Sequence, residues 1–174
     1  MNSNSLLSGF AILFLSAAVG VSPDGAATAK ADLADSQGKK VGTAELTQTT
    51  DGVEITLTVS GLTPGQHAFH IHNVGKCDAP DFKSAGAHFN PYNKKHGLKK
   101  PDGPHAGDME NIEVGPDGTG KAEIVNKQVT LAEGPNSLFH EGGTAIVIHA
   151  SPDDYVTDPA GNAGARVACG VITK

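Results

Sequence analysis

The segment from Asn73 to Asn111 constrains this chain more than any other part, because it is long and shows no strand or helix pattern. Glycine and proline interrupt it repeatedly, so it cannot fold through apolar contacts of its own. Irregular stretches longer than about 12–15 residues are uncommon in compact domains and are usually functional or disordered. Its three histidines and one of its aspartates are candidate metal ligands: His88, His96, His105 and Asp108. Three imidazoles and a carboxylate are the ligands of a closed, tetrahedral zinc site. If zinc binds them, the free energy of zinc binding would stabilise the folded loop. The alternative is a solvated loop with scattered histidines.

Three further histidines extend this pattern to a second metal. His70 and His72 lie two apart on an expected strand, so their imidazoles share one face while Phe69 and Ile71 point the other way, into the core. His149 closes the apolar run from Ala145. Imidazole alone suits zinc or copper. Two four-coordinate sites need eight ligands and the sequence offers seven, so one imidazole would have to bridge, and spacing does not say which. Two histidines are expected to be structural or exposed, outside the site: His67 and His140.

Most of the remaining chain consists of short apolar segments separated by turns. Apolar and polar residues alternate from Val53 to Ser60, and Asp51-Gly52 before them indicates a hairpin turn. We expect eight strands, over residues 41–49, 53–60, 66–72, 112–114, 121–125, 129–131, 145–150 and 166–172. The sequence shows no pattern of an amphipathic helix longer than a few turns. We therefore expect an all-β fold, an antiparallel sandwich or barrel. Two long loops, 73–111 and 150–165, interrupt the strands and are expected to be functional.

The N-terminal part of the chain has a different composition. The apolar run Phe10–Val21 is shorter than the roughly 18 residues that a membrane span needs, and it resembles the core of a secretory signal. We expect residues 1–31 to be a signal peptide, with an uncleaved N-terminal membrane anchor as the alternative. Residues 32–40 are expected to be a linker and residues 41–174 one domain. Export would place the protein in the periplasm, in the cell envelope or outside the cell.

The cysteine content and the charge bear on compartment and partners. Cys77 and Cys169 are the two cysteines, and an even number in an exported chain favours a disulfide over two buried free thiols. The formal net charge is −6 and the isoelectric point is near 5.7. The sequence contains no stripe of Lys and Arg interleaved with aromatic residues, which argues against nucleic acid as a partner.

Five segments, in this order, resemble the copper/zinc superoxide dismutases, and in particular an exported, bacterial-type member. They are His67-Ala68-Phe69-His70-Ile71-His72, Ser84-Ala85-Gly86-Ala87-His88-Phe89-Asn90-Pro91, His96-Gly97, His105-Ala106-Gly107-Asp108 and the run Gly161–Ile172. The likeness covers about residues 41–173. It implies an eight-stranded antiparallel Greek-key β-barrel.

The resemblance also implies roles for individual residues. The copper ligands would be His70, His72, His88 and His149. The zinc ligands would be His88, His96, His105 and Asp108. His88 would bridge the two ions and carry a proton, and Arg166 would dock the substrate anion. Asp153 would brace a ligand of each metal, and Cys77 and Cys169 would form the family's disulfide.

The implied activity is dismutation of superoxide to O₂ and H₂O₂, as antioxidant defence. One copper per chain would cycle between Cu(II) and Cu(I) beside one zinc. The rival hypothesis is a non-catalytic copper/zinc-binding or copper-chaperone-like relative. Such relatives typically lose copper ligands or the docking arginine, whereas this chain has all of them. The resemblance does not decide whether the protein is a homodimer.

Four lysines flank His96: Lys94, Lys95, Lys99 and Lys100. They either steer superoxide or form an ordinary solvated surface, and we favour the second.

Overall fold

The structure is a computed structural model that describes residues 25–174. Nine strands carry nearly all of its regular structure: β1 (Thr28–Asp35), β2 (Lys40–Thr49), β3 (Gly52–Val59), β4 (Gly65–His67), β5 (Phe69–His72), β6 (Ile112–Val114), β7 (Gly120–Asn126), β8 (Ala145–His149) and β9 (Arg166–Val171). One short 3₁₀ helix, η1, covers Lys83–Ala85. Among the described residues, no helix is long and apolar enough to cross a membrane.

The strands form one antiparallel sheet in the order β4-β6-β7-β3-β2-β1-β9-β8-β5. Strands β4 and β5 lie at opposite edges of the sheet, yet only Ala68 separates them in the chain. The sheet therefore curls into a nearly closed barrel, and the crossovers from β3 to β4 and from β7 to β8 give it Greek-key connections. This confirms the all-β antiparallel Greek-key prediction.

The number of strands differs from the predicted eight for three reasons. Strand β1 was expected to be leader and linker. The predicted strand 66–72 bends at Ala68 into two strands that pair with different neighbours. The predicted strand 129–131 is an irregular segment with only one isolated bridge, between Thr130 and Ser137.

The structure corrects the expected linker at 32–40. Strand β1 runs to Asp35 and pairs with both β2 and β9, so the barrel begins at Thr28 rather than at residue 41. Ala29, Ala31 and Leu33 face the core and their neighbours face solvent. Two of the three apolar positions are alanine, which makes the alternation weak in the sequence. The leader itself lies mostly outside the described residues, and residues 28–31 of the expected leader belong to β1.

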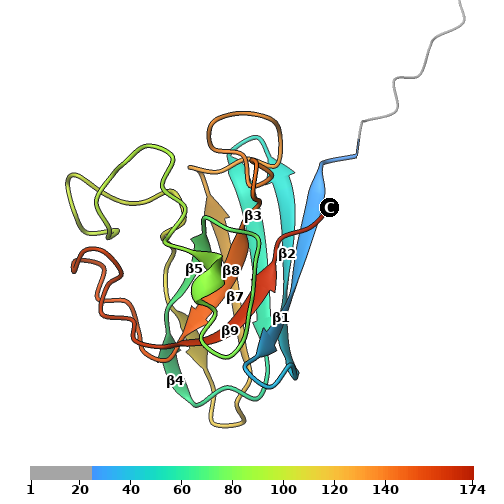
Figure 1. Ribbon diagram of the computed structural model, residues 1–174, viewed down its shortest axis with the longest axis vertical. Helices are drawn as coiled ribbons and strands as arrows, with labels where there is room; N and C mark the ends of the chain where they lie inside the picture. The colour runs from blue at the N-terminus through green and yellow to red at the C-terminus, as the bar shows by residue number, and fades with distance from the viewer. Residues whose placement is uncertain (1–24) are drawn as a thin grey trace, which may run out of the picture.

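The alternation of side chains along β5 and β8 separates the core from the functional face. Phe69 and Ile71 on β5 point into the main core, as predicted, and Ile146 and Ile148 on β8 join them there. The residues between them point outward, beneath the long loops. Figure 1 shows the second loop (150–165) and the later part of the first loop (73–111) on the side of the barrel away from β1, while the chain around η1 crosses in front of β8 and β9. They bury this outer face of β5 and β8, including its histidines.

The disulfide and a second, small apolar cluster fix the start of the first loop. Cys77 and Cys169 are joined by a disulfide, which ties the loop to β9. Phe82 and Ala85 pack there against the outer face of β8 and β9, at Val147 and Cys169. The chain around η1 is therefore held to the barrel both covalently and by apolar packing.

Candidate metal centre

Four imidazoles converge on one point outside the barrel wall, and all four are buried. They belong to His70 and His72 on β5, His88 in the first loop and His149 at the end of β8. We call them the imidazole cluster. Each ring has one buried nitrogen without a hydrogen-bond partner: Nδ1 of His70, and Nε2 of His72, His88 and His149. An unpaired buried polar atom costs about 1–3 kcal/mol. Four such nitrogens at one point indicate a metal site, and an all-imidazole set suits copper.

The second nitrogen of each of these rings is fixed by a neighbour. His70 Nε2 donates to Asp153 Oδ2 at 2.8 Å, and His72 Nδ1 donates to the Gly86 carbonyl at 2.9 Å. His149 Nδ1 donates to the Gly164 carbonyl at 3.3 Å. Such outer hydrogen bonds select the tautomer and orient the ring. The unpaired nitrogens therefore carry lone pairs rather than protons.

A second cluster consists of three imidazoles around a carboxylate: His88, His96, His105 and Asp108. We call it the carboxylate cluster. Asp108 Oδ1 lies 2.9, 3.1 and 3.3 Å from Nδ1 of His88, His96 and His105 respectively. Asp108 Oδ2 accepts backbone hydrogen bonds from Gly97 and His105. The donor set of three nitrogens and one oxygen fits tetrahedral zinc.

His88 is the residue that the two clusters share. Its Nε2 belongs to the imidazole cluster and its Nδ1 faces Asp108 in the carboxylate cluster. The stacking of the His88 and His70 rings, with centroids 4.0 Å apart, keeps the shared ring against the barrel wall. The geometry thus offers one donor nitrogen to each cluster from a single imidazole.

Asp153 connects the two clusters a second time. Its Oδ2 accepts from His70 in one cluster, and its Oδ1 accepts from His96 Nε2 in the other at 3.1 Å. The carboxylate is buried in the loop that follows β8. Gly161 approaches it so closely that a Cβ there would lie 1.9 Å from Oδ1. No larger residue fits at position 161 unless Asp153 moves.

Burial and neighbouring carboxylates shift the pKa values of these histidines in opposite directions. Burial lowers the pKa of His72 to about 2, of His149 to about 3 and of His88 to about 4, so these rings are neutral, the form that binds metal. Burial also acts on His96, but its hydrogen bonds to the Asp108 and Asp153 carboxylates outweigh burial and raise its pKa to about 9. The carboxylate cluster thus favours positive charge, as a divalent cation site requires.

Arg166 lies beside the imidazole cluster and is firmly held. Its Nη1 donates to the Phe82 carbonyl at 2.7 Å, and its Nη2 donates to the Gly86 carbonyl at 2.6 Å. The same Gly86 carbonyl accepts the bond from His72. The guanidinium is only half-buried, so it presents a fixed positive charge near the cluster.

The two remaining histidines lie outside both clusters. His67 is buried, with its ring nitrogens 2.8 Å from the carbonyls of His149 and Thr63. His140 stacks on Phe89 with ring centroids 5.3 Å apart. Both contacts are structural. Sequence reasoning missed Asn111, which contacts Asp153, because its only signal is a position directly before a strand.

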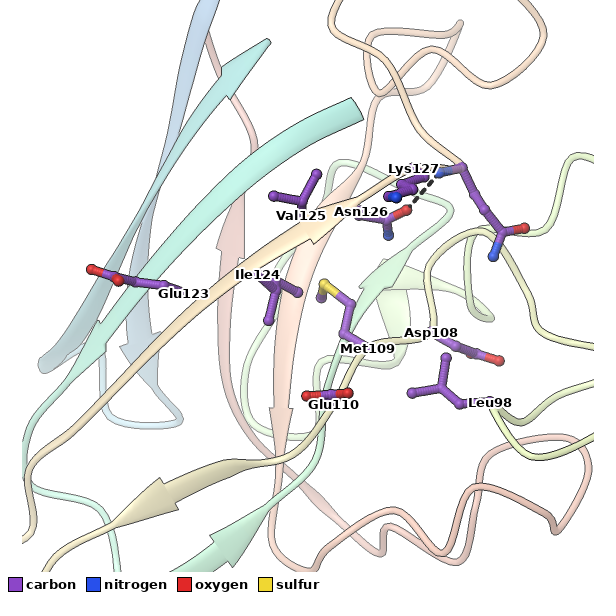
Figure 2. A pocket seen from close by; sticks show the side chains of 10 residues that line it. Leu98, Asp108, Met109, Glu110, Glu123, Ile124, Val125, Asn126 and Lys127 are labelled. Carbon is purple, nitrogen blue, oxygen red and sulfur yellow. Dashed lines mark hydrogen bonds between the residues drawn. The ribbon is translucent and has the colours of Figure 1, made fainter. Parts of the chain in front are cut away.

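One pocket lies apart from the imidazole cluster. It measures about 370 Å³ and lies between the first loop and β7. Figure 2 shows Met109 projecting from the loop toward Ile124 and Asn126 of β7. Asp108 is the one residue of either cluster in its lining. The site defined by convergent nitrogens is thus distinct from this pocket.

Comparisons with known proteins agree with this geometry. The family model for copper/zinc superoxide dismutase matches residues 40–172. "Superoxide dismutase [Cu-Zn] 1" of Aquifex aeolicus is 59% identical over 82% of this chain and 85% of the relative. The Caulobacter vibrioides "Superoxide dismutase [Cu-Zn]" is 49% identical over 78% of this chain and 79% of the relative. The crystal structure of a double mutant of a SOD-like protein from Bacillus subtilis superposes with a TM-score of 0.79 at 43% identity, over 82% of this chain and 95% of that one. The Greek-key barrel and the two clusters joined through one imidazole agree with this match over most of the chain. This chain belongs to the copper/zinc superoxide dismutase family.

Proposed function

We propose that this protein dismutes superoxide to O₂ and H₂O₂ at one copper ion and one zinc ion per chain. Copper would be held by His70, His72, His88 and His149, and zinc by His88, His96, His105 and Asp108. The observation that carries the proposal is the set of four buried, unpaired ring nitrogens at one point. Superoxide is the substrate of the family, and imidazole donors are those that copper accepts.

The copper held by these residues would supply one-electron redox chemistry between Cu(II) and Cu(I), which couples oxidation of one superoxide to O₂ with reduction of a second one that takes up two protons to become H₂O₂. The chain supplies the surroundings for this chemistry. Arg166 attracts and orients the anion with a guanidinium already fixed by two carbonyls. His88 Nε2 is the atom at which the chain can hold one of the protons. Asp153 and the Gly86 carbonyl keep His70 and His72 in their tautomers.

Replacing Arg166 with alanine should lower kcat/KM by about 10²-fold, the scale seen when a fixed charge donor is removed from a catalytic site. Metal content, measured by mass spectrometry, should stay at one copper and one zinc. Arg166→Lys keeps the charge but loses the planar fork, so its rate should lie between the two. A wild-type protein that holds both metals but has negligible activity would favour the rival role in metal binding. An Arg166→Ala protein with the wild-type rate would refute the docking role.

The four lysines around His96 are expected to contribute little to steering. Lys95 Nζ lies 3.6 Å from Asp158 Oδ2, and Lys99 Nζ lies 4.9 Å from the centroid of the Tyr155 ring. Two of the four charges therefore have local partners. Changing all four to glutamine should leave the salt dependence of kcat/KM unchanged, as for an ordinary solvated surface. A clearly flatter salt dependence, with a lower kcat/KM at low salt, would instead assign them a steering role.

The disulfide supports export. Disulfides persist in oxidising compartments and are rare in the reducing cytosol. Cys77 and Cys169 are paired, and among the described residues no free cysteine is present. We infer that the protein works in the periplasm, in the cell envelope or outside the cell.

A further inference from the structure

The Asn111 side chain makes hydrogen bonds to both the N–H and the carbonyl of Asp153. Its Oδ1 accepts from the Asp153 N–H at 2.8 Å, and its Nδ2 donates to the Asp153 carbonyl at 3.1 Å. One bond accepts and the other donates, so the side-chain amide satisfies both backbone groups of a single residue of the second loop. Asn111 itself directly precedes β6, so it belongs to the barrel's rigid part.

A third bond ties the same two segments together. The Asn111 N–H donates to Tyr155 Oη at 2.8 Å, and the Tyr155 N–H donates to Asp153 Oδ1 at 2.6 Å. Residues 153 to 155 lie in an irregular loop, where no sheet pairing fixes the backbone. Asn111, at the start of β6, and Tyr155, in the second loop, therefore largely set the position and direction of the Asp153 carboxylate.

We propose that Asn111 is a positioning residue for both metal sites, acting through Asp153. Asp153 orients His70 in the imidazole cluster and His96 in the carboxylate cluster. If Asn111 no longer holds residue 153, both imidazoles lose the partner that fixes their tautomer and ring direction. This inference rests on the proposed function, because it concerns affinity for the copper and zinc assigned there.

The test measures metal affinity rather than activity. Zinc and copper binding to wild type and to Asn111→Ala would be measured by competition with a chelator of known affinity. Loss of an outer partner of a metal ligand typically costs 10- to 100-fold in affinity, and we expect that range for zinc and for copper. The Cu(II) electron paramagnetic resonance spectrum should also change, because the His70 ring would turn. Asn111→Asp, which has the same shape but lacks the Nδ2 donor, should weaken both sites as well, and it keeps the test open if the alanine variant folds poorly.

Gln48→Ala is the matched control. The Gln48 amide also ties an irregular segment to the barrel, accepting from Thr130 Oγ1 and from the Leu131 N–H, but it lies outside both clusters. It should lower thermal stability and leave both metal affinities and the Cu(II) spectrum at wild-type values. A similar loss of affinity in Gln48→Ala would mean that the effect of Asn111 is one of general stability, and would overturn the proposal.

A double-mutant cycle provides the sharpest result. If Asn111 acts only through Asp153, Asn111→Ala should add no further loss of affinity in an Asp153→Ala background. Multiplicative losses, or wild-type affinities in both Asn111 variants, would overturn the inference. Failure of the proposed function looks different, because the wild-type protein itself would then either fail to bind one copper and one zinc per chain or bind both without dismuting superoxide.

Discussion

His88→Ala should lose zinc, weaken copper binding and reduce the dismutation rate by more than about 100-fold. The estimate is a lower bound, because outer partners of metal ligands alone are worth 10- to 100-fold and His88 is a proposed direct ligand of both ions. Its ring is the only one in both clusters, with Nε2 in one and Nδ1 in the other. Metal content by mass spectrometry and superoxide consumption after a pulse would measure the two effects.

Two other histidines serve as comparisons. His105 belongs to the carboxylate cluster alone, so His105→Ala should weaken zinc binding while copper binding is largely retained. His140 lies outside both clusters and stacks on Phe89, so His140→Ala should keep both metals. If His88→Ala bound both metals and turned over at the wild-type rate, the shared-imidazole site and the proton role of His88 Nε2 would both have to be given up.

Removal of the disulfide should lower the free energy of unfolding by about 4–5 kcal/mol. The bond closes a loop with a sequence separation of 92 residues, and in the chain-entropy model a loop of that length restricts the unfolded chain by this amount. For a domain of this size each kcal/mol corresponds to about 2–4 °C in Tm, so the Cys77→Ser/Cys169→Ser variant should melt about 8–20 °C lower.

Metal-free protein is the appropriate sample for this measurement, because bound metals would stabilise the folded state by mass action. Wild type in the presence of a reductant should approach the Tm of the double serine variant, while the variant should not respond to the reductant. A loss below about 1 kcal/mol would show that packing of Phe82 and Ala85 already holds the loop to the barrel, and that the covalent bond adds little.

The sequence predicted the fold class and the candidate ligands because both leave strong local patterns. The alternation between Val53 and Ser60 is that of strand β3, and the seven candidate ligands fall into the two clusters found in the structure. Strand β1 was missed because alanine fills two of its core positions, where larger apolar residues would have revealed the period. The bend at Ala68 was missed because nothing in the run from Gln66 to His72 marks the change of pairing partner.

Asn111 illustrates what no local pattern can reveal. Its importance comes from two hydrogen bonds to a residue 42 positions later in the chain, and these exist only once the second loop lies against the start of β6. The same holds for the Gly86 carbonyl, which gains its role from Arg166 and His72 on different strands. Backbone groups carry no sequence signature, so their part in the site is visible only in three dimensions.

The bridge made by Asp153 has a thermodynamic consequence. Two separate atoms of one carboxylate orient an imidazole in each cluster, so an ion that orders one ring also orders the other before its own ion arrives. We expect loading of the two proposed metals to be coupled, and because coupling free energy is reciprocal, copper would then aid zinc as much as zinc aids copper. The affinities of the two sites would then not be independent, and a substitution confined to one site should also change metal affinity at the other.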